Sequence, residues 1–488
     1  MPQYLQRIIE AGYQLSPDAY VYLTSISPEI ADTLAQKAIL KADASLQPLL
    51  VLDKEYLIYL VETSKPPPLP QKIRSIPAKD LGAHIKVFEE EPAQRASDAE
   101  GFLSYFQSRF DRLEAILKRR IDVKDAISIE QALKLPVKTK LKTMGIVVEK
   151  RTRANKLFIE LEDRKSSISV MATDEEKVRH GLEIQEDQVI AVDAVKYTDD
   201  LLIVNDWIWP DVPSNQPRRS PEPLYAVLLA DIHVGSKFFR ADLFDKFISW
   251  INLELGPPQS RDAAARVKYL VIAGDLVDGV GIYPEQLNEL SITAIHEQYR
   301  TAADLLRQLP DYIEIIIIPG NHDATRHSMP QPPIPREYAE PLYDNPHVNM
   351  LPTPCRLNLN GVELLAEHGK GLDDVLNSTP GYEFKHPIKA MELLLRCRHF
   401  APRYGQTTPI APEKTDRLVI SSIPDVLLMG HIHINETKRY KGVTLVSAGS
   451  WQDQTPFQKR VQLDPTTGVA TLFDLQTHQP LDLDFKRF

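Results

Sequence analysis

The spacing of apolar residues divides the chain into three kinds of pattern. Residues 1–62 place apolar side chains at helical spacing, as at Ile30, Leu34 and Ala38, after Ser-Pro pairs that are typical of helix starts. From residue 143 to about residue 209, short segments alternate apolar and polar positions, as half-buried strands do. From residue 224 onward, continuous apolar runs alternate with helical patterns. The chain is therefore predicted to be multidomain, with a small helical N-terminal unit, a β-barrel and an α/β domain.

Five segments of the alternating region are predicted strands. They are residues 144–150, 156–162, 167–172, 189–195 and 201–207. Five strands within about 65 residues indicate a small closed barrel, of which the oligonucleotide-binding (OB) type is the commonest with five strands. A preceding helical segment carries Phe102, Phe106 and Phe110 on one face, so we expect it to pack against a neighbouring domain.

Basic residues gather at the start of the predicted barrel. Residues 134–156 hold eight Lys or Arg against one acid, Glu149. Such a patch either contacts nucleic acid or is a solvated barrel face. The candidate nucleic-acid contacts here are Lys138, Lys140, Lys142, Arg151 and Arg153. Beside a Pro-rich loop at residues 329–336, Arg326 and Arg336 could hold a phosphate.

Two Pro-rich segments separate the patterned regions. Residues 65–70 read Lys-Pro-Pro-Pro-Leu-Pro, which is typical of a stiff, extended linker, and residues 212–221 contain three further prolines. The predicted organisation is a small helical domain at 1–62, a Pro-rich linker at 63–97, a helix plus OB-fold domain at 98–210, a linker at 211–223 and a last domain at 224–488.

Composition narrows the class of protein. With 57 Lys and Arg against 67 Asp and Glu, the net charge is −10, so the chain is a poor candidate for coating nucleic acid through bulk charge. Its two cysteines cannot build a disulfide framework, which fits a reducing compartment. The first residues do not read as a secretory signal, and no apolar run approaches the ~18 residues of a membrane span. We therefore expect a cytoplasmic protein without membrane contact.

Five loops of the last domain carry the candidate chemistry, and each follows a predicted buried strand. They contain Asp231 and His233, then Asp275 and Asp278, then Asn321, His322 and Asp323, then His368, and finally His431 and His433. Ligands collect at strand ends in layered α/β folds because loops there aim side chains inward. Imidazole and carboxylate donors suit Mn, Fe or Zn. Seven ligands from these loops are too many for one ion and fit two ions. An aspartate such as Asp275 could bridge the two ions.

The order of these motifs resembles a known superfamily. Asp-x-His, Gly-Asp-x-x-Asp, Gly-Asn-His-Asp, a single His and Gly-His-x-His are similar to the signature of calcineurin-like dinuclear metallophosphoesterases, over residues 224 to about 450. The resemblance implies a two-layer β-sandwich flanked by helices. Residues 367–374, 386–391, 396–424 and 430–458 further resemble the small subunits of archaeal family-D DNA polymerases, and this likeness runs from about residue 98 to the end of the chain.

This resemblance implies a role for each candidate residue. One ion would be held by Asp231, His233, Asp275 and His433, and the other by Asp275, Asn321, His368 and His431. His322 would contact the scissile phosphate and protonate the leaving 3′ oxygen, with Asp278 orienting its imidazole. The implied cofactors are two divalent metal ions, usually manganese; the donor set leaves iron, zinc and magnesium open.

The function implied is that of the proofreading 3′→5′ exonuclease subunit of a heterodimeric replicative DNA polymerase. Its implied partners are a large catalytic polymerase subunit and DNA, mainly single-stranded 3′ ends. Two alternatives stay open: a free-standing metallophosphoesterase or repair nuclease, and a polymerase scaffold subunit without catalysis. The C-terminal segment 479–488 loosely suggests a sliding-clamp peptide, but a final strand or a frayed tail is the preferred interpretation.

Overall fold

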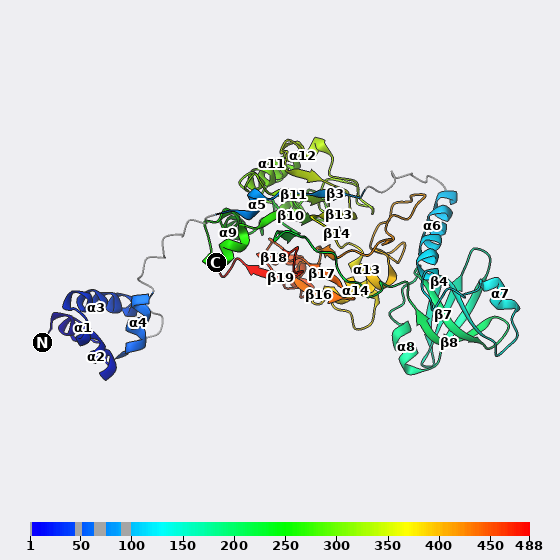
Figure 1. Ribbon diagram of the computed structural model, residues 1–488, viewed down its shortest axis with the longest axis horizontal. Helices are drawn as coiled ribbons and strands as arrows, with labels where there is room; N and C mark the ends of the chain where they lie inside the picture. The colour runs from blue at the N-terminus through cyan, green and yellow to red at the C-terminus, as the bar shows by residue number, and fades with distance from the viewer. Residues whose placement is uncertain (1, 44–50, 63–74, 89–98) are drawn as a thin grey trace. The chain divides into compact units, whose positions relative to one another are not determined.

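The computed structural model describes residues 2–43, 51–62, 75–88 and 99–488 (Figure 1). These residues belong to two compact units, Met1–Arg74 and Ser75–Phe488. The predicted Pro-rich stretch at 65–70 lies outside the described residues. Within the described part of the chain, no helix is long and apolar enough to cross a membrane.

The first unit is helical, as its apolar spacing predicts. Its elements are α1 (Gln3–Glu10), β1 (Gln14–Leu15), α2 (Pro17–Ser25), α3 (Pro28–Asp43), β2 (Val51–Leu52) and α4 (Lys54–Glu62). Ser16 caps α2, because its hydroxyl accepts a hydrogen bond from the Ala19 amide at 3.3 Å. Ile8, Leu23 and Leu57 are fully buried in a core shared by the helices.

The second unit contains a closed five-stranded barrel. Its strands are β4 (Lys140–Arg153), β5 (Lys156–Glu162), β6 (Ser167–Ala172), β7 (Val189–Lys196) and β8 (Leu201–Ile208), closed in the order β4-β5-β6-β8-β7. Helices α6 (Ala99–Lys118), α7 (Ile129–Lys134) and α8 (Glu175–Gly181) accompany it (Figure 1). The five predicted strands and the closure of the barrel are confirmed, whereas the OB type stays a prediction.

Two six-stranded sheets form the rest of this unit. The first has the order β12-β11-β10-β9-β18-β19, from β9 (Tyr225–Leu229), β10 (Val267–Ala273), β11 (Glu314–Ile318), β12 (Val348–Met350), β18 (Val469–Asp474) and β19 (Pro480–Asp484). The second has the order β16-β17-β15-β14-β13-β3, from β3 (Ile85–Val87), β13 (Cys355–Leu359), β14 (Val362–Ala366), β15 (Val426–Met429), β16 (Glu436–Tyr440) and β17 (Val443–Ser447). Strand β19 matches the preferred interpretation of the C-terminal segment.

The sheets pack face to face and carry helices on their outer sides. Leu228 and Val271 of the first sheet share a buried core with Leu364 and Leu428 of the second. The first sheet's other face packs against α9 (Ala241–Ile251), α11 (Ile295–Leu306) and α12 (Arg336–Tyr343), with α10 (Pro258–Ala264) beside α9. Helices α13 (Leu372–Ser378) and α14 (Pro387–Cys397) join the core on the second sheet's side. The expected sandwich flanked by helices is therefore present.

Residues 75–88 lie inside the predicted linker at 63–97 yet belong to the sandwich. Helix α5 (Pro77–Asp80) is fastened by Lys268, whose Nζ donates to the Ala78 carbonyl at 2.8 Å. Strand β3 then pairs antiparallel with β13 at the sheet edge. A strand of three residues is too short to show a period in the sequence, so the pattern gave no sign of it.

Helix α6 contributes a buried arginine to the interior of the second unit. Arg109 and Asp416 both have fully buried side chains and form an ion pair at 2.7 Å. Arg109 also donates to the carbonyl oxygens of Pro402 (2.6 Å) and Asp187 (3.1 Å). His399 meets the same Asp416 oxygen at 2.8 Å. This Arg109 network (Arg109, Asp187, His399, Pro402, Asp416) joins α6, a barrel turn and the sandwich.

Candidate metal centre

The candidate ligands meet at one end of the sandwich because they follow neighbouring parallel strands. Strands β9, β10 and β11 run parallel in the first sheet, and β14 and β15 run parallel in the second. The five ligand loops leave the carboxyl ends of these strands, and the carboxyl ends of parallel strands lie at one edge. The fold thus gathers side chains that are up to 202 positions apart, from Asp231 to His433.

Five of the seven predicted ligands have a left-handed backbone. The φ angles are 53° at Asp231, 56° at His233, 52° at Asp275, 70° at His431 and 63° at His433. A residue with a Cβ pays roughly 1–2 kcal/mol for this conformation. The glycines of the motifs permit the resulting close packing, since a Cβ on Gly320 would collide with Asp275 Oδ1. Strain concentrated in this way is typical of functional sites.

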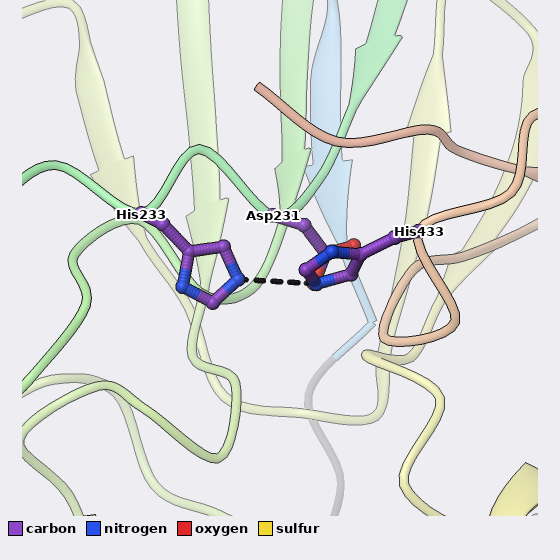
Figure 2. A group of neighbouring side chains, drawn as sticks. All are labelled: Asp231, His233 and His433. Atoms are coloured by element: carbon purple, nitrogen blue, oxygen red, sulfur yellow. Dashed lines mark hydrogen bonds and ion pairs between the residues drawn. The ribbon is translucent and has the colours of Figure 1, made fainter. Parts of the chain in front are cut away.

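The first group comprises Asp231, His233 and His433 (Figure 2). The Nε2 atoms of the two histidines lie 3.2 Å apart. Asp231 Oδ1 lies 3.4 Å from Nε2 of His433 and 3.9 Å from Nε2 of His233. This buried oxygen has no hydrogen-bond partner among the described residues. A buried carboxylate oxygen left without a donor is costly, and convergence with two imidazole nitrogens suits a bound cation.

The second group comprises Asp275, His368 and His431, with Asn321 beside it. Nε2 of His368 lies 3.3 Å from Asp275 Oδ2 and 3.0 Å from Asn321 Oδ1. The same Asp275 oxygen lies 3.8 Å from Nε2 of His233 in the first group. Asp275 therefore stands between the two groups, which is the position that a bridging carboxylate needs.

His322 and Asp278 lie beside the first group, with contacts that differ in part from the expectation. Nδ1 of His322 lies 2.7 Å from the backbone carbonyl oxygen of Asp278. The Asp278 carboxylate instead lies 3.0 Å from Nδ1 of His233. The His322 amide donates to Asp275 Oδ1 at 2.8 Å, and its ring packs edge-on against His233 at 4.7 Å between centroids. Asp278 thus meets His322 through its backbone and His233 through its side chain.

Two buried acids near His322, Asp275 and Asp323, have pKa values shifted in opposite directions. Burial opposes the ionisation of Asp275, but the neighbouring imidazoles of His368 and His322 outweigh it and hold the pKa of this carboxyl well below its usual range. Burial and the charge of Asp275 raise the pKa of Asp323 to about 6. Asp323 accepts hydrogen bonds from the Gly320 amide (2.9 Å) and the Tyr299 hydroxyl (3.0 Å). It therefore braces the loop that carries Asn321 and His322.

Outer partners of the histidines include two residues that the sequence did not single out. Nδ1 of His433 lies 2.9 Å from the Gln458 side-chain amide, and Nε2 of His431 lies 3.0 Å from Asp373 Oδ2. Nδ1 of His368 lies 2.9 Å from the Ala273 carbonyl. Gln458 comes from α15 (Pro456–Arg460) and Asp373 from α13. Neither residue follows a strand, so the strand-end rule could not find them.

The candidate nucleic-acid contacts lie elsewhere in the unit. On or just before β4, Lys138, Lys140, Arg151 and Arg153 are exposed, and Lys142 lies 3.7 Å from Asp125. Their contact with DNA stays a prediction. The two loop arginines already have partners within the chain: Arg326 binds the Pro330 carbonyl (2.8 Å) and Glu413 (2.5 Å), and Arg336 pairs with Asp344 (2.5 Å).

Comparison with known proteins places this architecture in a family. A family model that describes the B-subunit of DNA polymerases alpha and epsilon matches residues 226–438. The DNA polymerase II small subunit of Archaeoglobus fulgidus is 37% identical over 413 residues, which cover 84% of this chain and 82% of that protein. The chain belongs to the family of archaeal DNA polymerase II small subunits. The resemblance to the small subunits of archaeal family-D DNA polymerases is thereby confirmed.

Other members of this small-subunit family have comparable sequence identity to this chain. That of Methanothermobacter thermautotrophicus is 40% identical over 378 residues, covering 76% of this chain and 77% of that protein. That of Pyrococcus horikoshii is 38% identical over 393 residues, covering 80% of this chain but 63% of its own length. The chain thus spans less than two thirds of the Pyrococcus relative.

Two solved structures show a distant likeness to this chain. An archaeal phosphodiesterase is 12% identical, with a TM-score of 0.27, over 53% of this chain and 99% of that one. The telomere capping protein Ten1 from Saccharomyces pombe is 22% identical, with a TM-score of 0.15, over 17% of this chain and 77% of that one. TM-scores this low do not establish a shared fold.

Proposed function

We propose that the chain is the proofreading 3′→5′ exonuclease subunit of a two-subunit archaeal DNA polymerase and hydrolyses phosphodiester bonds at a two-metal centre. The observation that carries the proposal is Asp231 Oδ1, buried without a hydrogen-bond donor while two imidazole nitrogens face it. Buried carboxylate oxygens in native proteins are usually paired, so an unpaired one that faces two imidazole nitrogens favours a ligand role. The scaffold alternative leaves the oxygen unexplained.

The donor set fits two divalent cations. Asp231, His233, Asp275 and His433 would hold the first, and Asp275, Asn321, His368 and His431 the second, since their ligand atoms already converge in two groups. The proposed ions are manganese. When bound, they would polarise the phosphate as Lewis acids and lower the pKa of a bound water. The chain's own contribution is to hold the ligand atoms apart from bulk water and in fixed orientation.

His322 is proposed as the residue that handles the proton of the leaving 3′ oxygen. A carbonyl oxygen can only accept, so the contact with the Asp278 carbonyl requires the hydrogen to sit on Nδ1 of His322. Nε2 is then the nitrogen that can take up a proton and give it to the departing oxygen. The Asp275 carboxylate, which accepts from the His322 amide, fixes the loop beside the phosphate position.

The proposed partners are a large catalytic polymerase subunit and single-stranded 3′ ends of DNA. The named relatives are polymerase subunits, which favours a heterodimer over a free-standing repair nuclease. The exposed basic residues on and just before β4 are the proposed contact for the DNA backbone, assisted by the predicted OB character of the barrel. Clamp binding by the C-terminal segment stays a weaker prediction, because residues 480–484 are already used in β19.

The test follows single-stranded DNA labelled at either end, with Mn²⁺ present. We expect shortening from the 3′ end, abolished by a chelator and reduced about 10²–10⁴-fold by His322→Ala. His327→Ala is the matched control, since His327 lies exposed in the same loop. An isolated chain that is inactive is tested again with its reconstituted large subunit. Absence of chelator-sensitive 3′ shortening in that complex would refute the proposal.

A further inference from the structure

Each of the four histidines at the metal centre has one ring nitrogen fixed by an outer partner. In His233, His368 and His433 that nitrogen is Nδ1, held by the Asp278 carboxylate, the Ala273 carbonyl and the Gln458 amide respectively. Their Nε2 atoms face the ligand groups. His431 is turned the other way, because its Nε2 meets Asp373 Oδ2 at 3.0 Å. Its remaining nitrogen, Nδ1, is therefore the one available to a cation.

Asp373 is held firmly in this position. It lies in the first turn of α13, and Lys370 binds the same carboxylate oxygen at 2.6 Å. The loop before α13 packs so closely on the segment after α14 that a Cβ on Gly371 would collide with the Phe400 carbonyl oxygen. On the opposite side, the His431 amide donates to Asp231 Oδ2 at 2.8 Å. His431 is thus fixed at its backbone by one acid and at its ring by another.

We propose that Asp373, supported by Lys370, is a positioning residue that turns Nδ1 of His431 toward the second cation. The proposal rests on the two-metal function above and adds a residue to it. A carboxylate accepts only, so its contact places the ring hydrogen on Nε2 and leaves the lone pair on Nδ1, where a metal ligand needs it. Loss of such an outer partner typically weakens metal binding about 10–100-fold.

The experiment measures Mn²⁺ binding by calorimetric titration of the full chain, with no activity assay. The unsubstituted chain is expected to bind two equivalents. Asp373→Ala is expected to weaken one equivalent about 10–100-fold and leave the other unchanged. Asp373→Asn, whose amide oxygen can still accept from Nε2, is expected to restore part of the loss. Lys370→Met is expected to give a smaller weakening of the same equivalent.

A double substitution separates positioning from direct ligation. If Asp373 acts through His431, the pair Asp373→Ala with His431→Ala binds Mn²⁺ no more weakly than His431→Ala alone. Additive losses would mean that Asp373 binds the cation itself and would overturn the proposal. The matched control is Asp374→Asn, the next residue of α13, whose carboxylate accepts from the amides of Thr407 (2.9 Å) and Thr408 (3.2 Å) away from His431.

The outcomes distinguish this proposal from the function on which it rests. Two equivalents in both the unsubstituted chain and Asp373→Ala, with equal affinity, would overturn the role of Asp373 alone. No bound Mn²⁺ in any form would overturn the two-metal function and this inference together. Circular dichroism of each variant checks that a lost equivalent does not come from a lost fold. If Asp373→Ala fails to fold, Asp373→Asn carries the comparison with Asp374→Asn.

Discussion

The second unit contains two buried clusters of acids and histidines that use their polar atoms in opposite ways. In the Arg109 network, both oxygens of Asp416 are used: Oδ2 meets Arg109 and His399, and Oδ1 accepts from the Leu418 amide at 3.0 Å. In the metal centre, Asp231 Oδ1 has no donor among the described residues. The two clusters contain similar residue types. They differ in whether each buried carboxylate oxygen has a hydrogen-bond partner within the protein.

This contrast distinguishes a structural cluster from the proposed metal site. The Arg109 network balances a carboxylate with a guanidinium that cannot lose its charge, and it ties together segments up to 307 positions apart. In the candidate metal centre, imidazole nitrogens converge on the carboxylates of Asp231 and Asp275. One oxygen of Asp231 nevertheless has no hydrogen-bond partner among the described residues. The first arrangement satisfies both oxygens of Asp416 within the protein, whereas the second leaves Asp231 Oδ1 for the cation that the proposed function requires.

The largest expected effect on stability comes from breaking the Arg109 network. Asp416→Ala should lower the free energy of unfolding by about 3–5 kcal/mol, because it leaves the Arg109 charge buried without its partner. Urea denaturation followed by tryptophan fluorescence measures the loss. The control is Asp304→Ala, which removes an exposed pair with Arg307 and should change little. Equal losses of unfolding free energy in the two variants would show that the Arg109 network stabilises the fold no more than an exposed ion pair does.

The next effect is a dependence of stability on pH that His399 brings to the same cluster. Burial, assisted by the charge of Arg109, lowers the pKa of His399 to about 4. The unfolded value is about 6.5, so the unfolded chain binds more protons between these limits. The contribution of His399 is therefore complete above pH 6.5 and is lost as the pH falls toward 4, by at most about 3 kcal/mol.

Replacing His399 should make that pH dependence shallower. Urea midpoints of His399→Gln at pH 7.5, 6 and 5 should fall less steeply than those of the unsubstituted chain. His327→Gln, which changes an exposed histidine, should keep the original slope. A slope that His399→Gln leaves unchanged would contradict the buried neutral state of this imidazole.

The smallest expected effect on stability comes from a substitution in the candidate metal centre. Asp231→Asn keeps an oxygen for the His431 amide and removes a carboxylate with one unpaired oxygen, so the metal-free protein should change by less than about 1 kcal/mol. The unsubstituted chain should gain about 2.7 kcal/mol from Mn²⁺ at 100 times its dissociation constant, and the variant should lose most of this gain. Urea curves with chelator and with Mn²⁺ give both values. A metal-free loss as large as that of Asp416→Ala would make Asp231 structural.

Local patterns predicted much of the fold and of the ligand set. The five barrel strands show alternation, and six strands of the sandwich show apolar runs, because each buries one or two faces along its whole length. These six are β9, β10, β11, β14, β15 and β17. The ligand motifs follow those strands directly, so finding the strands also located the loops. Strands β3, β12, β13, β16 and β18 were missed: β3 and β12 have only three residues and β16 is mostly polar, whereas the apolar residues of β13 and β18 were not assigned to strands.

The sequence by itself determined which residues stand at strand ends, and tertiary structure alone decided which polar atoms they meet. Asp373 reaches His431 across 58 positions and Arg109 reaches Asp416 across 307. Neither pairing has a local signal, since hydrophobic periodicity states which face of an element is buried and nothing about its polar partner. The carboxylate of Asp278 meets His233 while its carbonyl meets His322 for the same reason. Such contacts follow from the packing of whole elements, which fixes directions that spacing along the chain does not contain.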